Sequence, residues 1–242
     1  MGALAYGQLN YRLGQFHARE RLGRTGEETD DVLRSLLHRL VEGGGPPTRT
    51  LRGIPVVVEN TRPDIVTEEV FARIDGALAL IEQYQPWNFR RMRRDFAAIV
   101  SRRYPCRGAY FPDERVCLVE LTFAVNPDFS LPQVAATILH EAMHARLDRM
   151  GVRGERLSRA REERFCRRAE IEFGQAVHGG GPVVERALAS LAGADEEVAP
   201  VIDWALASER VARADLEALE APAWLKRAAV RRRGLEDGGG GG

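Results

Sequence analysis

Two histidines and a glutamate within five residues, His140, Glu141 and His144, could together hold and use a metal ion. Side chains four positions apart on an α-helix lie one turn above each other on the same face, so both imidazole rings can reach one ion. Zn²⁺ binds neutral imidazole nitrogens at about 2.0–2.1 Å, which this spacing allows. Glu141 would stand beside the open coordination position and act as general base toward a zinc-activated water. The residues therefore predict a catalytic zinc site.

The segment around these residues, 130–150, has the pattern of a buried helix. Ser130 suits the N-cap, Pro132 the first turn and Gln133 the capping-box position. Gly151 is placed to end the helix. Apolar residues give it a broad hydrophobic face: Leu131, Val134, Ala135, Ile138, Leu139, Ala142, Met143 and Leu147. Two ordinary half-buried histidines are the alternative, but buried histidine and glutamate without partners would be costly, so the setting favours a metal site.

Two histidines need a third protein ligand, and the next expected helix, 155–177, offers the candidates Glu162, Glu163, Glu170 and Glu172. Its buried stripe is predicted to consist of Phe165, Cys166, Ala169, Phe173 and Ala176, with Cys166 as a small core residue. Glu162 falls inside that stripe, while Glu163 and Glu170 lie along one border. Glu172 lies away from it. A border carboxylate is well placed to meet a metal held by the neighbouring helix, but periodicity alone does not choose among them.

These motifs resemble those of the gluzincin branch of the zincin metallopeptidases, of which thermolysin is the familiar member. The resemblance rests on the H-E-x-x-H residues and on Glu163, nineteen positions after His144 on the next long helix. The stretches ILHEAMHARL and REERFCRRAEIEF are also similar to small bacterial H-E-x-x-H proteins. The resemblance covers residues 107–177, and in it position 162 corresponds to a core side chain.

The resemblance implies a zincin-like fold that hydrolyses a peptide bond. His140, His144 and Glu163 would hold Zn²⁺, and Glu141 would be the general base and then the proton donor to the leaving amine. The chain departs from thermolysin at Arg167, which stands where an aspartate would orient the first histidine. The partner of that histidine therefore stays open.

Two alternatives are also open. Peptide deformylases combine H-E-x-x-H with an upstream cysteine, so Cys117 could be a ligand of a deformylase-like amide hydrolase, although the flanking glycine and serine of that motif are absent. A non-enzymatic regulatory or binding protein could retain the fold, but a structural zinc site has no use for a base such as Glu141. Candidate donors to a transition-state oxyanion are His178, Tyr110 and Arg149.

Local patterns predict an α+β fold, a mainly helical zincin-like domain with a small β-sheet next to the H-E-x-x-H helix. The expected elements before that helix are a strand at 54–59, helices at 67–83 and 87–103, and a β-hairpin of 108–111 and 116–125. Residues 116–125 alternate between an apolar and a mixed face. Zinc peptidases keep an edge strand in this place, which pairs with extended substrate.

The expected organisation has four parts. Residues 1–45 form an N-terminal helical segment with a helix at 27–40, and residues 46–181 form the zincin-like catalytic core. Residues 182–235 form a helical C-terminal extension, and 236–242 a disordered glycine tail. The helices expected in the extension span 183–191, 198–219 and 223–233, with Trp204 and Trp224 packing them onto the core.

Composition gives weaker expectations about partners and location. The 242 residues include 35 basic and 35 acidic side chains, so no net charge favours nucleic acid or a membrane as partner. No apolar run is long enough to span a bilayer and no signal peptide is apparent. Three cysteines without a C-x-x-C pair suit a reducing, cytoplasmic compartment. A peptide or protein substrate is expected, and the sequence does not specify an oligomeric state.

Overall fold

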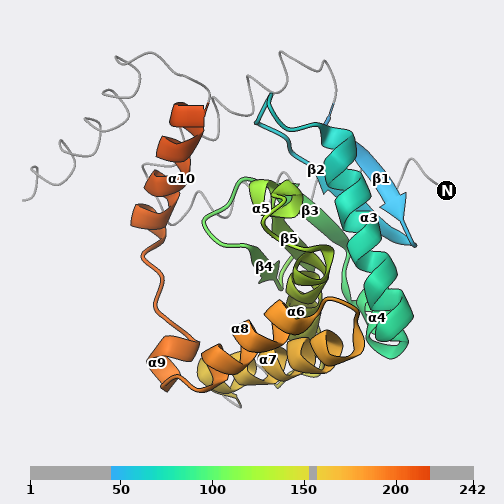
Figure 1. The fold of residues 1–242 in the computed structure, drawn as a ribbon, viewed down its shortest axis with the longest axis vertical. Coiled ribbons are helices and arrows are strands. Elements are labelled where there is room, and N and C mark those ends of the chain that lie inside the picture. The colour runs from blue at the N-terminus through green and yellow to red at the C-terminus, as the bar shows by residue number, and fades with distance from the viewer. Residues whose placement is uncertain (1–44, 153–156, 219–242) are drawn as a thin grey trace, which may run out of the picture.

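A computed structural model describes residues 45–152 and 157–218, and these form the expected α+β fold. The strands are β1 (Thr48–Leu51), β2 (Ile54–Val58), β3 (Ala98–Arg102), β4 (Gly108–Phe111) and β5 (Val116–Glu120). The helices are α3 (Thr67–Tyr84), α4 (Pro86–Asp95), α5 (Leu121–Val125), α6 (Leu131–Arg149), α7 (Arg159–Ala176), α8 (Gly181–Leu191), α9 (Asp195–Val198) and α10 (Trp204–Ala218). Figure 1 shows their arrangement.

The five strands form one mixed sheet in the order β1-β2-β3-β5-β4. Strands β2, β3 and β5 run parallel, and the two edge strands β1 and β4 are antiparallel to their neighbours. The main hydrophobic core lies between one face of this sheet and helices α3, α4, α6 and α7. A smaller cluster of Val57, Ala98, Val100 and Val116 covers the other face. Every residue of β3 and β5 is therefore buried.

The prediction of one helix over residues 87–103 is wrong for the second half of that range. Helix α4 ends at Asp95, the backbone becomes extended at Phe96, and β3 follows. Ile99 and Val100 are β-branched and lie in the centre of the sheet between β2 and β5. A strand buried on both faces reads as a continuous apolar run, which periodicity cannot distinguish from a buried helix.

The hairpin is confirmed, but its second strand is shorter than predicted. Strand β5 ends at Glu120, whose carboxylate accepts the Phe123 backbone N–H at 2.7 Å and so caps the short helix α5. The predicted alternation therefore stops at Glu120. Strand β5 is interior, and the edge strand beside α6 is β4, its hairpin partner.

Helix α6 forms where it was predicted. The Ser130 backbone N–H donates to Gln133 Oε1 at 2.8 Å, as a capping box requires, and Pro132 lies in the first turn. Gly151 follows the helix with a φ of +64°, a value that disfavours side chains with a Cβ. The helix contacts α3, α4, α7, β4 and β5, which explains why it is buried on most of its circumference.

Helix α7 packs against α6 on one side and α8 on another. Phe165 was predicted to be buried but is 43% exposed, because the buried face passes through Glu162, Cys166, Glu170 and Phe173 instead. The helix predicted at 183–191 is confirmed as α8. The one predicted at 198–219 is interrupted: α9 ends at Val198 and α10 begins at Trp204.

Helix α10 is attached to the rest of the fold by few contacts. Asp215 accepts from Arg103 Nε at 2.7 Å and from Arg62 Nη1 at 3.3 Å, and the Trp204 ring lies 5.7 Å from that of Tyr104. Several predicted features lie outside the described residues: the helices at 27–40 and 223–233, Trp224 and the glycine tail 236–242.

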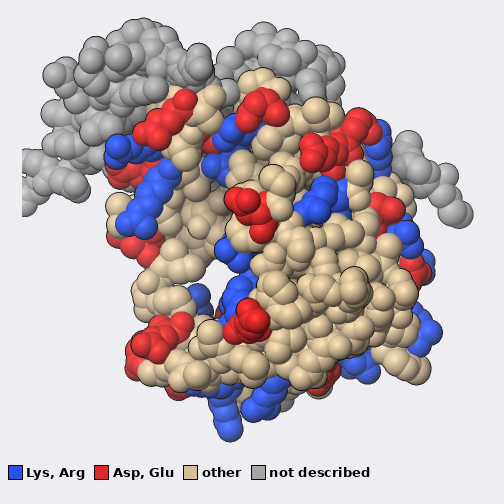
Figure 2. Space-filling view, in the orientation of Figure 1, with Lys and Arg blue, Asp and Glu red and all other residues tan. Residues whose placement is uncertain are grey.

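The surface of the described part mixes charges of both signs. Figure 2 shows basic and acidic side chains interspersed over the visible face, with no extended patch of one sign. None of the described helices is both long enough and apolar enough to cross a bilayer.

Candidate metal centre

Three side chains from α6 and α7 converge on one point. The Nε2 atoms of His140 and His144 lie 3.1 Å apart. Glu163 from α7 brings Oε2 to 3.2 Å from His140 Nε2 and Oε1 to 3.5 Å from His144 Nε2. Ligands about 2.0–2.1 Å from a tetrahedral zinc ion are separated by about 3.3–3.4 Å. The spacing of these donors therefore fits a zinc ion.

The other ring nitrogen of His140 contacts a carboxylate. His140 Nδ1 lies 2.6 Å from Glu170 Oε1, and Glu170 is fully buried. Arg167 and Arg186 donate to the same carboxylate at 2.6 and 2.9 Å. A carboxylate on Nδ1 fixes the ring orientation and leaves Nε2 for a metal. Sequence reasoning considered Glu170 as a ligand and left the partner of His140 open.

Glu162 lies on the other side of the second histidine. It is buried, as expected for a residue inside the stripe, and its Oε2 is 3.8 Å from His144 Nδ1. This distance is too long for a hydrogen bond. Glu162 thus lies on the Nδ1 side of the His144 ring, opposite the Nε2 atom that faces His140 and Glu163. His144 Nδ1 has no hydrogen-bond partner in the described part of the chain.

A cysteine also belongs to this cluster. Cys166 is fully buried on α7, and its sulfur lies within 4.8 Å of a ring nitrogen of each histidine. It was expected to be a core residue, and its position three residues after Glu163 on the same helix face could have indicated the proximity. Cys117 instead lies on β5 within the hydrophobic core, where burial raises the pKa of its thiol.

Glu141 lies between α6 and the edge strand. Only 5% of it is exposed, and burial raises the pKa of its carboxyl group. A Cβ on Gly108 of β4 would lie 2.9 Å from Glu141 Oε1 and 2.7 Å from Thr137 Cγ2. Only glycine lets the edge strand approach the carboxylate so closely.

The histidines and carboxylates of the cluster shift one another's pKa values. Burial alone would lower the pKa of His140, but the neighbouring Cys166 sulfur and contacts with Glu163 and Glu170 outweigh it and raise the pKa to about 10. Burial likewise opposes ionisation of Glu163, yet its contacts with both histidines bring the pKa of the carboxyl well below its usual range. Buried carboxylates thus hold protons on the rings that a divalent cation could replace.

The three candidate oxyanion donors are dispersed. The Tyr110 hydroxyl on β4 donates to Asp148 Oδ2 at 3.4 Å, and Arg149 Nε lies 3.0 Å from Asp95 Oδ1. His178 is exposed beyond the end of α7.

Comparison of the chain with protein-family models, with curated proteins and with solved structures gives no match.

Proposed function

We propose that the protein is a zinc-dependent metallopeptidase with a zincin-like fold. The observation that carries this proposal is the convergence of His140 Nε2, His144 Nε2 and the Glu163 carboxylate at separations of 3.1–3.5 Å. Three protein ligands leave one position for water or substrate, which is the arrangement of catalytic rather than structural zinc.

The chain's own residues supply the proton transfers. A bound zinc ion would polarise a carbonyl and lower the pKa of a water molecule. Glu141 takes the proton of the attacking water and passes it to the leaving amine, and its buried carboxyl with a raised pKa supports both steps. Glu170 holds His140 through Nδ1, so that the ring keeps its orientation.

Strand β4 offers a way to orient an extended peptide. It is the outer strand on this side of the sheet and packs against α6. Glu120 N donates to Arg107 O, so by the alternation of antiparallel pairs the backbone groups of Gly108 face away from β5. A peptide added to this edge would pass beside Glu141.

The test of catalysis is Glu141→Gln. This variant should keep the fold and bind one equivalent of zinc, because Glu141 is not a ligand, while hydrolysis of a peptide library falls by about two to four orders of magnitude. His140→Ala provides the metal-free comparison. A wild-type protein that binds zinc but cleaves no peptide in the library would contradict the proposed peptidase function.

A second candidate function is favoured by Cys166. If its sulfur joined the two histidines and Glu163, the four ligands would close the site, as in a structural or regulatory zinc centre of a non-enzymatic protein. Substitution of Co²⁺ for zinc distinguishes the two, because thiolate ligation gives a sulfur-to-cobalt charge-transfer band that Cys166→Ser would remove. The peptidase predicts no such band.

A further inference from the structure

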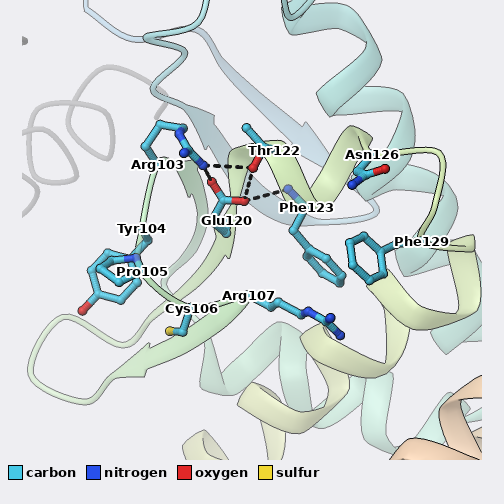
Figure 3. A pocket seen from close by; sticks show the side chains of 10 residues that line it. All are labelled: Arg103, Tyr104, Pro105, Cys106, Arg107, Glu120, Thr122, Phe123, Asn126 and Phe129. Atoms are coloured by element: carbon cyan, nitrogen blue, oxygen red, sulfur yellow. Dashed lines mark hydrogen bonds and ion pairs between the residues drawn. The ribbon is translucent and has the colours of Figure 1, made fainter. Parts of the chain in front are cut away.

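A cavity of about 250 Å³ lies at the start of the edge strand β4, where Cys106 and Arg107 line it directly before Gly108. Figure 3 shows its walls: Tyr104 and Pro105 on one side, Phe123 and Phe129 on the other, and Arg107 along the lower edge between them. The cavity combines aromatic walls with a few polar groups, the usual character of a binding pocket.

One of the two arginines in the wall is neutralised. Arg103 donates to Glu120 through Nη1, to Thr122 Oγ1 at 2.9 Å and to Asp215 Oδ1 at 2.7 Å. These partners satisfy its charge. Arg103 therefore holds the pocket together and is not available to a ligand.

The other arginine is not neutralised. The guanidinium of Arg107 lies 4.3 Å from the ring centroid of Phe129 and 5.4 Å from that of Phe123, and it forms no ion pair with any described residue. Burial and the charges of Arg186 and Arg167 lower its pKa. The aromatic rings hold the side chain in place, and within the described part of the chain no carboxylate pairs with its charge.

The pocket lies one residue along the chain from Gly108, which packs against the proposed general base Glu141. Arg107 precedes Gly108, the residue that packs against Glu141, and successive residues in a strand are separated by about 3.3 Å. Cys106, also in the wall, donates from its sulfur to Gly108 O at 2.9 Å. A peptide lying along β4 with its reacting carbonyl at Glu141 therefore brings a neighbouring group of the peptide to Arg107.

We propose that this pocket binds a carboxylate of the peptide substrate through Arg107, so that the protein acts on acidic peptides. The inference rests on the proposed peptidase function and adds its substrate class. A guanidinium presents a planar fork of N–H donors that matches a carboxylate, and the two rings beneath it reduce the entropy lost on binding. The carboxylate could belong to a glutamate or aspartate side chain or to the peptide C-terminus.

The experiment compares matched peptides. Glutamate is replaced by glutamine at each position in one set, and the C-terminal carboxylate by an amide in the other, so that the two sources are distinguished. The wild type should prefer the carboxylate form by about tenfold in kcat/KM. Arg107→Ala should abolish that preference, Arg107→Lys should retain part of it, and Arg107→Glu should favour peptides with lysine instead. Arg90→Ala is the control, because Arg90 also stacks on an aromatic ring, Trp87, but does not line the pocket.

A binding measurement separates the two proposals. Calorimetric titration of the zinc-loaded Glu141→Gln protein with the same peptides reports recognition without catalysis. If the wild type cleaves peptides without a preference for carboxylates, and Arg107→Glu does not change its selectivity, the pocket assignment is wrong. The proposed peptidase function is then still supported. Carboxylate-dependent binding that Arg107→Ala abolishes supports the pocket even if the wild type cleaves nothing. Absence of both cleavage and carboxylate-dependent binding overturns both.

Discussion

The orientation of His140 depends on a chain of charged side chains. Arg167 and Arg186 bind Glu170, and Glu170 binds His140 Nδ1. In the gluzincin pattern an aspartate is expected at position 167. Here an arginine at that position binds a glutamate three residues later, which does reach the ring. The same orienting contact is thus obtained from a different position, one helical turn further along α7.

Glu170→Gln tests this contact. The amide keeps the shape of the side chain but removes the charge, so zinc affinity should fall by about 10–100-fold in competition with a chelator. Glu172→Gln is the matched control, because Glu172 lies on the exposed side of the same helix. Equal affinity in both variants would show that Glu170 contributes only to packing.

The third ligand is tested by three substitutions. Glu163→Ala leaves two histidines, too few for a stable three-ligand site, so zinc affinity should fall steeply. Glu162→Ala should lower mainly the melting temperature, because its carboxylate approaches the opposite ring nitrogen. Cys117→Ser should leave the zinc content unchanged. Zinc stoichiometry with thermal melts checks all three, and zinc retained in Glu163→Ala but lost in Glu162→Ala would assign the ligand to Glu162.

The relation of His140, Glu141 and His144 could be predicted from sequence because helix geometry alone sets it. The contact between Glu170 and His140 could not, because it depends on how α6 and α7 cross. Periodicity placed Glu163 and Glu170 on the border of the buried face of α7, but Glu170 lies fully buried within that face. It did not reveal which of them faces which ring nitrogen.

Among the elements, the strands were harder to predict than the helices. Helices α6 and α7 are long and have capping residues at their starts, Ser130 and Ser158. Strand β3 has only five residues, all buried, and two residues separate it from the end of α4. The sequence pattern therefore predicts one continuous helix. The edge position of β4 also follows from strand order, which no local pattern contains.

Gly108→Ala tests whether the approach of β4 to Glu141 matters. The added methyl would lie 2.9 Å from Glu141 Oε1 and 2.7 Å from Thr137 Cγ2, so the strand or the carboxylate must move. A displacement of this size at the reacting groups should lower kcat/KM by about 10–100-fold while zinc binding persists. Gly181→Ala is the control, because a Cβ there meets no atom within 4 Å. Full activity in Gly108→Ala would separate β4 from catalysis.

In the whole molecule, the candidate site joins two parts of the fold. Helix α6 packs directly on the sheet. Helix α7 packs on α6 and also contacts α8 and α9. Arg164 of α7 binds Asp195 of α9 and donates to Gly193 O at 3.1 Å. Ion pairs join histidines of α6 to glutamates of α7 at the cluster. A cation at this point would link both parts.

Zinc should therefore stabilise the folded protein as a whole. At a free zinc concentration 100-fold above the dissociation constant, binding to the folded state alone contributes about 2.7 kcal/mol. For a chain of this size each kcal/mol raises the melting temperature by about 2–4 °C, so a shift of about 5–11 °C is expected in calorimetry. The double variant His140→Ala/His144→Ala should show no shift, whereas His178→Ala, which removes a histidine on the exposed surface, should keep it. An equal shift in the double variant would place zinc elsewhere, and no shift in the wild type would mean that the cluster joins α6 and α7 through its ion pairs alone.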